Sequence, residues 1–294
     1  MPIAKEQVTV VIPTLNEEGA IGQVLDDLGK VGFGSIVVID GYSTDRTQAI
    51  VRSIGIQLLM QNGPGKAGAI KMAIAQVTTP YMLVMDGDGT YSPQDAERLL
   101  QSEEFDEVIG ARTNGRHNIP IVNRLGNYLL SKLFQLLFLS PITDVCSGMY
   151  LLRTDFAKAL DIASTSFDVE VEIAGQVASR GRITQVPITY EKRIGNKKLR
   201  SYGDGTRILR TLIKMAAFYN AGLFFGTIAA FAAIPGTALL LFAVYQELAS
   251  DTLLAWHLVF GVILLLIGLQ GGSLALMSVL FKRSEHRIIE EIRR

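Results

Sequence analysis

The chain has 294 residues, 49% of them hydrophobic, and its 28 acidic side chains balance its 28 basic ones. This balance excludes the basic excess typical of nucleic-acid binders, so no nucleic-acid partner is expected. The single cysteine, Cys146, cannot form an internal disulfide, which fits a reducing compartment. The apolar run near the N-terminus is too short for a signal peptide, so none is expected there.

Short apolar runs alternate with amphipathic stretches in the first part of the chain. The amphipathic stretches predict helices, and their ranges are 17–28, 45–54, 67–77 and 93–100. The apolar runs predict strands, and their ranges are 8–13, 36–40, 56–61, 81–86 and 107–112. Near-continuous apolar strands are typical of parallel sheets that are covered on both faces. The alternation therefore predicts an α/β fold with an open, doubly wound, mostly parallel sheet.

Acidic residues follow three of the predicted strands. Glu17 comes after the first strand, Asp40 ends the second, and Asp86 and Asp88 follow the run at 81–85. In doubly wound sheets, ligands bind at the carboxyl ends of the strands. Carboxylates gathered at one edge need a cation to offset their repulsion, which favours a metal or a ligand donor there. The alternative for Asp86 and Asp88 is a capped turn with solvated side chains.

The stretch NGPGKAG at 62–68 has the composition of a phosphate-binding loop before a helix. Its glycine spacing and the Ala67 after Lys66 do not match a P-loop, so a turn and helix cap is the simpler interpretation. Lys66 remains a candidate contact for donor phosphates. The three histidines are scattered, and no serine or cysteine has a matching histidine and acid, so nucleophilic catalysis is not indicated.

The segment 120–139 is apolar but is interrupted by Arg124 and Lys132, so it is not expected to span a membrane. Its pattern favours a helix that lies on the membrane surface, where Arg124 would meet a lipid phosphate. The alternative is a helix of the domain core. Residues 201–214 are expected to form a second, juxtamembrane helix.

Two long segments, 215–246 and 252–281, contain no charged residue. Each exceeds the about 20 residues needed to cross a bilayer, so they predict a transmembrane hairpin after a soluble domain at 1–200. Basic residues precede the first segment and follow the second, whereas the only charged residues of the connecting turn are Glu247 and Asp251. The flanking cations are Arg207, Arg210, Lys214, Lys282, Arg283 and Arg287. The positive-inside rule therefore predicts a cell-membrane protein with a cytoplasmic domain and a cytoplasmic tail at 282–294.

Five pieces of the sequence carry a resemblance to a known family. In chain order they are VTVVIPTLNEE, IVVIDGYSTDRT, VMDGDGTY, DVCSGMYLLR and VPITYEKRIGNKKL, and they extend over residues 8–199. They resemble the inverting family-2 glycosyltransferases of GT-A fold, in particular the polyprenyl-phosphate branch that includes dolichyl-phosphate mannose and glucose synthases. The resemblance implies a GT-A, Rossmann-like catalytic domain followed by the two-helix hairpin.

The same resemblance implies roles for individual residues. Pro13, Asn16 and Glu17 would lie against the nucleotide, and Asp40 would hydrogen-bond its base. Asp88 would ligate a Mg²⁺ or Mn²⁺ ion, with Asp86 beside it positioning the donor. The cations near the donor and acceptor phosphates would be Arg112, Arg124, Arg193 and Lys198.

The chain departs from the family pattern at Gly41, Tyr42, Thr90 and Lys197. Because a glutamine is common at the position of Thr90, the second protein ligand of the metal is left open. Arg193 belongs to the segment R-x-G-x-K-K, where a bidentate guanidinium near a flexible glycine suits phosphate capture.

The sequence therefore predicts a hexosyltransferase that moves a sugar from a nucleotide diphosphate to polyprenyl or dolichyl phosphate. A UDP-sugar is favoured as the donor, and GDP-mannose is the alternative. The rival functions are a processive polysaccharide synthase and a non-catalytic nucleotide-sugar-binding membrane scaffold. Oligomeric state is left open, a homo-oligomer included.

Overall fold

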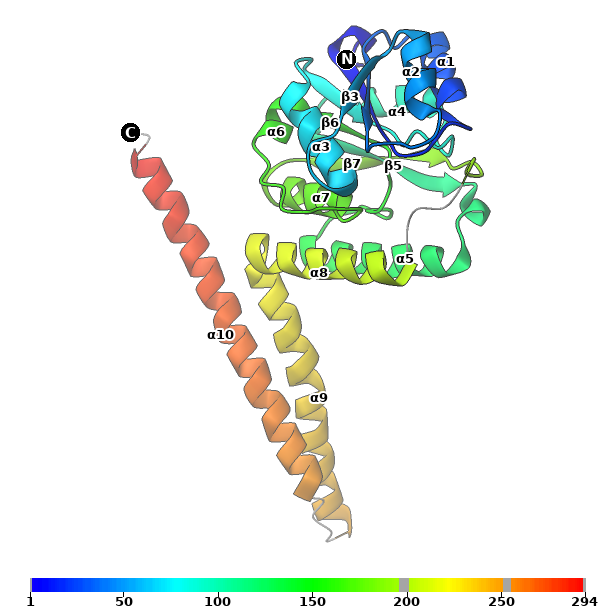
Figure 1. Cartoon of the computed structure of the whole chain (residues 1–294). Helices are drawn as coiled ribbons and strands as arrows, with labels where there is room; N and C mark the ends of the chain where they lie inside the picture. The colour runs from blue at the N-terminus through cyan, green and yellow to red at the C-terminus, as the bar shows by residue number, and fades with distance from the viewer. Residues whose placement is uncertain (1, 196–200, 251–254, 293–294) are drawn as a thin grey trace. The chain divides into compact units, whose positions relative to one another are not determined.

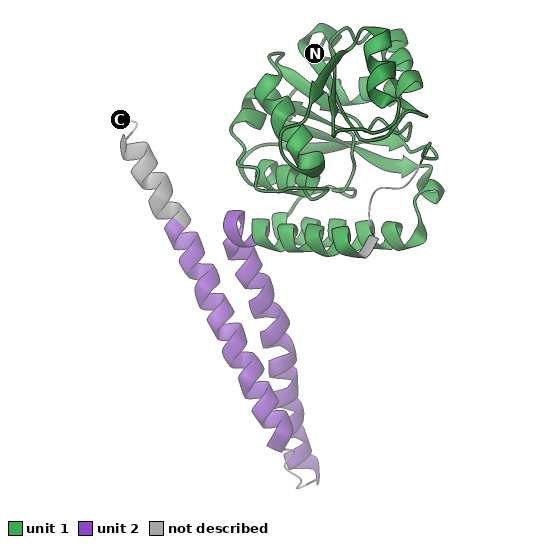
Figure 2. Cartoon of the chain, viewed as in Figure 1, with its two compact units in different colours: residues 1–215 green, residues 216–294 purple. Residues whose placement is uncertain are grey.

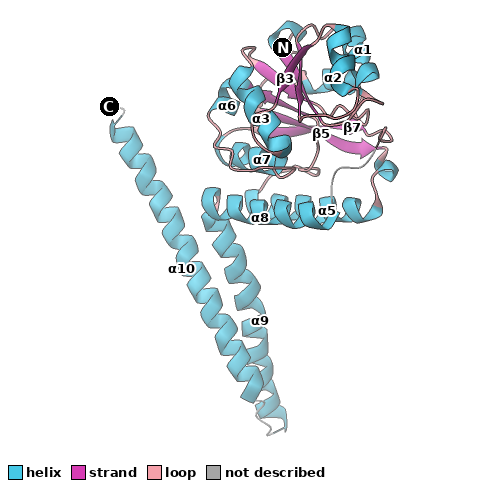
Figure 3. Cartoon of the chain, viewed as in Figure 1, coloured by secondary structure: helices cyan, strands magenta, loops and turns pink. Residues whose placement is uncertain are grey.

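The computed structural model of the chain describes residues 2–195, 201–250 and 255–292. It divides into two compact units, residues 1–215 and residues 216–294 (Figure 2). The first unit combines a sheet with helices, and the second is helical (Figure 3).

The first unit is built on a seven-stranded sheet with the strand order β3-β2-β1-β4-β6-β5-β7. Its strands are β1 (Val8–Thr14), β2 (Ile36–Asp40), β3 (Gln57–Met60), β4 (Tyr81–Val84), β5 (Glu107–Asn114), β6 (Tyr150–Arg153) and β7 (Ile183–Thr189). β6 is antiparallel to its neighbours β4 and β5, and every other pairing is parallel. The sheet is therefore mostly parallel, as the sequence predicted.

Most of the helices lie between consecutive strands in the chain, and the last one of this set follows β7 (Figure 1). They are α1 (Ile21–Val31), α2 (Thr47–Ile54), α3 (Gly65–Gln76), α4 (Pro93–Leu99), α5 (Ile121–Phe138), α6 (Thr154–Lys158), α7 (Val169–Arg180) and α8 (Ser201–Tyr219), with short 3₁₀ turns η1 (Lys5–Gln7) and η2 (Arg116–Asn118). α1 packs against α2 and α4, whereas α3 packs against α6, and α5 against α7.

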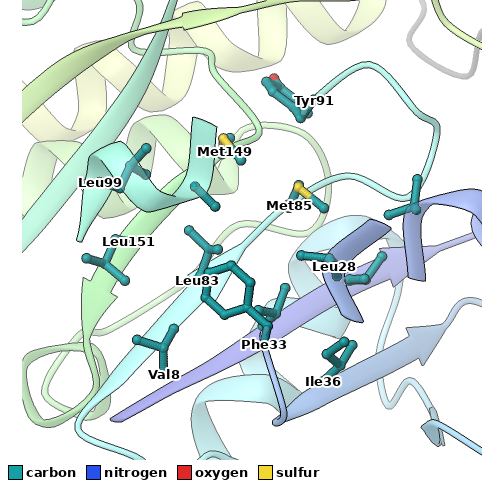
Figure 4. Close-up of a cluster of buried hydrophobic side chains, with 14 of the residues drawn as sticks. Val8, Leu28, Phe33, Ile36, Leu83, Met85, Tyr91, Leu99, Met149 and Leu151 are labelled. Carbon is teal, nitrogen blue, oxygen red and sulfur yellow. The ribbon is translucent and has the colours of Figure 1, made fainter. Parts of the chain in front are cut away.

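Both faces of the sheet are apolar. Along β1, Val8, Val10 and Ile12 belong to one buried cluster with residues of α1 and α4 (Figure 4). Val11, between them, is equally buried but points to the opposite face because side chains alternate along a strand. Burial on both faces explains why the strands read as continuous apolar runs, and it confirms the doubly wound architecture.

All five predicted strands are present, and β6 and β7 are additional. β6 is only four residues long, so it lacks the length of a clear strand signal. β7 contains Pro187, which argues against a strand in sequence but is tolerated here because β7 is an edge strand.

α5 has one buried face and one exposed apolar face. Phe134 and Leu137 are buried, whereas Ile121, Leu125 and Leu129 are more than half exposed. Phe138 at its end contacts Gly175 of α7, where a side chain would not fit without displacement. One face of α5 therefore packs into the domain, and contact of the exposed apolar face with a membrane stays a prediction.

The second unit is dominated by α9 (Ala221–Ser250) and α10 (Ala255–Ile292), which are long and apolar enough to cross a membrane over 221–250 and 255–281. They run antiparallel with close backbone approach, since Gly236 lies against Gly261 and Gly268 against Ala233.

The first apolar helix begins later than the predicted residue 215. α8 continues to Tyr219, and Met215 is buried against Gly175 of the first unit. Absence of charge alone could not separate the apolar end of α8 from the helix that follows it.

Candidate active site

The carboxyl ends of β1, β2 and β4 meet at one edge of the sheet. β1 pairs in parallel with both neighbours, so that Thr14 lies opposite Asp40 and Val11 lies opposite Val84. The Thr14 hydroxyl also donates a hydrogen bond to Asp40 Oδ2 at 3.2 Å. The acidic segments that follow these strands therefore converge, as the sequence predicted.

Asp88 is held in one orientation after β4. It is 4% exposed, and its Oδ1 accepts hydrogen bonds from the Thr90 backbone N–H at 3.0 Å and the Thr90 hydroxyl at 2.5 Å. Gly89, with φ of 76°, provides the tight turn between them. Burial, together with the nearby charge of Asp86, raises the pKa of Asp88 above its usual range. A cation near Asp88 would therefore be strongly favoured.

Arg193 supplies such a cation from the segment after β7. Its Nη1 donates to Asp88 Oδ2 at 2.6 Å, and its Nη2 donates to Glu17 Oε1 at 2.7 Å. The backbone N–H of Ile194 also donates to the carbonyl of Asp88 at 3.2 Å. Arg193 thus bridges the carboxylates that follow β1 and β4.

Asp86 is paired with a different cation. Lys66, in the first turn of α3, places its Nζ 2.6 Å from Asp86 Oδ1 and 2.6 Å from Glu170 Oε1 of α7. Burial alone would lower the pKa of Lys66, but the two carboxylates outweigh it and raise that pKa well above its usual value. Sequence reasoning included Lys66 and missed Glu170, because no local motif marks a partner more than a hundred positions away.

Asp40 is buried and hydrogen-bonded at the end of β2. It is 0% exposed. Its Oδ1 accepts from the Ser43 backbone N–H and the Gln48 amide, and its Oδ2 accepts from the Ser43 and Thr14 hydroxyls. These four hydrogen bonds order the loop after β2. The base contact expected for Asp40 stays a prediction.

Asn16 ties that loop to the end of β1. Its Oδ1 accepts from the Thr44 backbone N–H at 2.7 Å, and its own N–H donates to the Ser43 hydroxyl at 2.8 Å. Asn16 is exposed and has φ of 52°, while Pro13 is half-buried in β1. Their contacts with a nucleotide remain predictions.

Arg112 is buried within the protein rather than directed at an open site. Its guanidinium forms a bidentate ion pair with Asp144, at 2.7 and 2.6 Å, and lies 5.4 Å from the centre of the Tyr190 ring. Asp144 raises the pKa of Arg112 well above its usual value despite the opposing effect of burial. The ion pair gives Arg112 a structural role, and the donor-phosphate role expected from the sequence stays a prediction.

The two remaining predicted phosphate ligands differ in what can be said of them. Arg124 is exposed on the first turns of α5, and no ion pair to another described residue holds it. Lys198 lies outside the described residues, as does Lys197. Both roles remain predictions.

Other reactive groups do not assemble into a site. The described residues contain no group of three or more His, Cys, Asp or Glu side chains arranged to hold a metal. Burial raises the pKa of the Cys146 thiol to about 12, which makes it a poor nucleophile. These observations agree with the lack of a nucleophilic triad in the sequence.

Asp86 and Asp88 nevertheless fit a hard divalent cation. Mg²⁺ and Mn²⁺ prefer carboxylate oxygens and are commonly held by one or two protein carboxylates together with substrate phosphates. Each carboxylate is already matched by a positive group, Lys66 for Asp86 and Arg193 for Asp88. Both carboxylates therefore attract positive charge, and their oxygens are the ligands that such a cation requires.

The paired carboxylates and the facing arginine lie at the carboxyl edge of a doubly wound sheet, which is where such folds bind their ligands. The sequence profile described as glycosyl transferase family 2 matches residues 9–160. Among named relatives, glycosyltransferase AglJ of Haloferax volcanii is 30% identical over 98% of this chain and 98% of its own. The dolichyl-phosphate hexose transferase of the same organism is 31% identical over 71% of this chain and 94% of its own. The chain belongs to glycosyl transferase family 2 and is an enzyme of that family.

Solved structures support the fold. Glucosyl-3-phosphoglycerate synthase from Mycobacterium tuberculosis, in complex with Mn²⁺, UDP-glucose and phosphoglyceric acid, superposes with a TM-score of 0.60. It is 24% identical, and the match covers 71% of this chain and 79% of that one. The predicted GT-A-like fold is confirmed.

Proposed function

We propose that the enzyme transfers a hexose from a nucleotide diphosphate to dolichyl or another polyprenyl phosphate, with inversion at the anomeric carbon. The observation that carries the proposal is the Arg193 fork on Asp88 and Glu17, at 2.6 and 2.7 Å. It brings an anion-binding group onto the carboxylates at the carboxyl ends of β1, β2 and β4, which we call the donor edge. The name of the dolichyl-phosphate hexose transferase relative supports the same acceptor.

The donor would lie across the carboxyl ends of β1, β2 and β4. In this proposal Pro13, Asn16 and Glu17 border the nucleotide, and Asp40 acts indirectly by ordering the loop after β2. Asp86 and Asp88 face the diphosphate. A UDP-sugar is our preferred donor, and GDP-mannose is the alternative.

A divalent cation, Mg²⁺ or Mn²⁺, held by Asp88 and Asp86 would neutralise the charge of the departing nucleotide diphosphate. Lys66 keeps the Asp86 carboxylate in place at 2.6 Å. Arg193 adds a bidentate charge that suits phosphate oxygens once it exchanges Asp88 for them.

The acceptor phosphate would be oriented by Arg193, Arg124 and Lys198. One of its oxygens attacks the anomeric carbon from the face opposite the diphosphate, while the bond to the diphosphate oxygen breaks and its electron pair leaves with the nucleotide. A sugar hydroxyl would need a general base, but a phosphate monoester is already anionic at neutral pH.

The membrane arrangement is part of the proposal. α9 and the apolar part of α10 would span the bilayer, and the flanking cations would keep the catalytic domain on the cytoplasmic face. The exposed Ile121, Leu125 and Leu129 of α5 would contact the membrane surface, which brings Arg124 to the level of lipid phosphates. This enrichment of enzyme and lipid at one surface would raise their encounter rate.

The test is a transfer assay with the full-length chain in detergent. Purified enzyme, Mn²⁺ and polyprenyl phosphate are incubated separately with radiolabelled UDP-glucose, UDP-N-acetylglucosamine and GDP-mannose, and the lipid fraction is analysed. We expect one donor to give a lipid that carries a single sugar. A polymer in place of the single-sugar lipid would favour a processive synthase. Transfer to the hydroxyl group of an added sugar, but never to lipid phosphate, would contradict the proposed acceptor.

A further inference from the structure

A buried lysine sits between two carboxylates that come from separate parts of the chain. Lys66 Nζ lies 2.6 Å from Asp86 Oδ1 and 2.6 Å from Glu170 Oε1. The side chains of Lys66 and Glu170 are each 8% exposed, whereas that of Asp86 is 30% exposed. The cluster therefore opens toward the donor edge only through Asp86.

We propose that Glu170 is a positioning residue for glycosyl transfer, which fixes Lys66 and through it the Asp86 carboxylate. The proposal rests on the function proposed above, since it assumes that Asp86 faces the cation and the donor. It adds a residue on α7 that lies outside every motif of the donor edge.

Lys66 needs a second partner to hold one position. A lysine ammonium ends a flexible four-carbon stem and carries three donors, so a single contact with Asp86 leaves it free to rotate. Glu170 holds the ammonium from the buried side, and Asp86 contacts it from the more exposed side. Because one positive charge is shared by two negative ones, Asp86 also keeps negative charge for a cation.

Backbone also crowds the pair formed by Asp86 and Lys66. A Cβ at Gly148 would overlap Asp86 Oδ2 and would come within 3.1 Å of Lys66 Nζ. Gly148 is itself held, because its N–H donates to the Tyr91 hydroxyl at 2.7 Å. Gly148 and Lys66 thus both restrict Asp86, and a shift of the ammonium would displace the carboxylate.

Glu170 is in turn fixed by the start of α7. It is the second residue of that helix, where a carboxylate is favoured by the helix dipole. The preceding Asp168 accepts hydrogen bonds from the Ser166 backbone N–H at 3.2 Å and the Thr211 hydroxyl at 2.8 Å. Rigid support of this kind behind a ligand residue is what tunes metal sites, and its loss costs about 10- to 100-fold in metal affinity or activity.

Glu172 provides a matched control on the same helix. It is also buried, at 1% exposed, but its carboxylate accepts hydrogen bonds from the backbone N–H groups of Ala163 and Ser164 at 3.0 and 2.8 Å. Glu172→Gln makes the same chemical change as Glu170→Gln without touching Lys66. Its effect reports the structural cost of removing a buried charge from α7.

The experiment measures Mn²⁺ binding to the full-length enzyme in detergent by electron paramagnetic resonance, with UDP present and with GDP in a parallel series. We expect Glu170→Gln to raise the Kd for Mn²⁺ about tenfold or more, and Glu172→Gln to lower the melting temperature but leave that Kd unchanged. In a Lys66→Met background, Glu170→Gln should change the Kd by less than about twofold, since the connecting ammonium is gone.

A second variant separates the effect of the position of the Glu170 carboxylate from the effect of its charge. It also keeps the test valid if Glu170→Gln fails to fold. Glu170→Asp keeps the charge and withdraws it by one methylene, so we expect a Kd between those of the wild type and Glu170→Gln. A wild-type Kd in Glu170→Asp, or an equal shift in the presence and absence of Lys66, would overturn the proposed transmission through Lys66. If the wild-type enzyme binds no Mn²⁺ with either nucleotide, the proposed function itself fails, and this inference fails with it.

Discussion

Arg193 Nη1 lies 2.6 Å from Asp88 Oδ2. The arginine expected to bind phosphate therefore forms an ion pair with the carboxylate expected to bind the metal. The two residues are 105 positions apart in sequence and meet only because the segment after β7 passes beside the loop after β4. The guanidinium therefore offsets the charge of Asp88 and, at 2.7 Å, that of Glu17.

This relationship predicts that Arg193 and a divalent cation compete for Asp88. Arg193→Ala should bind Mn²⁺ more tightly than the wild type in the absence of nucleotide, measured by electron paramagnetic resonance. The same variant should lose about 10²-fold or more in transfer rate, because a charge-stabilising donor is missing. Arg193→Lys should also be impaired, since a point charge cannot replace the bidentate fork. The exposed neighbour Lys192→Ala is the control, and weaker Mn²⁺ binding by Arg193→Ala would refute the competition.

Asp88→Asn should abolish turnover while the fold is kept. The change removes one charge at nearly constant shape, and the Thr90 donors can still bond to the amide oxygen. We expect at least about a 10²-fold loss of transfer, with a circular dichroism spectrum like that of the wild type. Near-normal activity of this variant at any Mg²⁺ or Mn²⁺ concentration would contradict the role of Asp88 as a metal ligand.

Topology can be read from tags in intact cells. Tags placed before residue 1 or after residue 294 should resist external protease, because the flanking cations should keep both ends cytoplasmic. A tag inserted after Ala249, near the end of α9, should be cleaved. The reverse pattern of protection would refute a cytoplasmic catalytic domain.

The pH dependence of transfer should follow the acceptor rather than a protein base. A phosphate monoester has its second pKa at about 6, so the rate at subsaturating acceptor should rise through that pH and then level off. The measurement is initial rate against pH with the preferred donor at saturation. A rate governed by an ionisation at about 7.5 to 8, and abolished by replacing one carboxylate or histidine, would reveal a protein base and favour an alcohol acceptor.

Glu107 should make stability depend on pH. It is 1% exposed, no described residue donates a hydrogen bond to its Oε2, and burial raises its pKa well above the usual range. A raised pKa means that the folded protein binds this proton more tightly than the unfolded chain. Its contribution to the free energy of unfolding is therefore present below the ordinary carboxyl pKa and is lost as pH rises through the folded value.

Glu107→Gln should consequently raise the melting temperature at pH 8 and leave it nearly unchanged at pH 4. A gain of 1 kcal/mol corresponds to about 2–4 °C for a domain of this size. Differential scanning fluorimetry at both pH values measures the change, with the exposed Glu104→Gln as the control. An equal change at both pH values would show that the charge of Glu107 is not the cause.

Local pattern was enough to predict most of the fold. The strands at 8–13 and 36–40 were readable because both faces of the sheet are buried, so nearly every side chain along them is apolar. The two apolar helices were readable for a similar reason, since charge is absent over a length sufficient to span a membrane. Short β6 and the proline-containing edge strand β7 carried no such pattern and were missed.

The sequence by itself determined which residues follow the strands, and hence that Glu17, Asp86 and Asp88 gather at one edge. Only the tertiary structure decided their partners. Arg193 reaches Glu17 across 176 positions, and Glu170 reaches Lys66 through the packing of α7. Burial likewise assigned Arg112 to Asp144 and saturated Asp40 with hydrogen bonds. Periodicity and the succession of strands and helices along the chain are properties of neighbouring residues. A salt bridge, in contrast, depends on where distant segments meet once the whole sheet has formed.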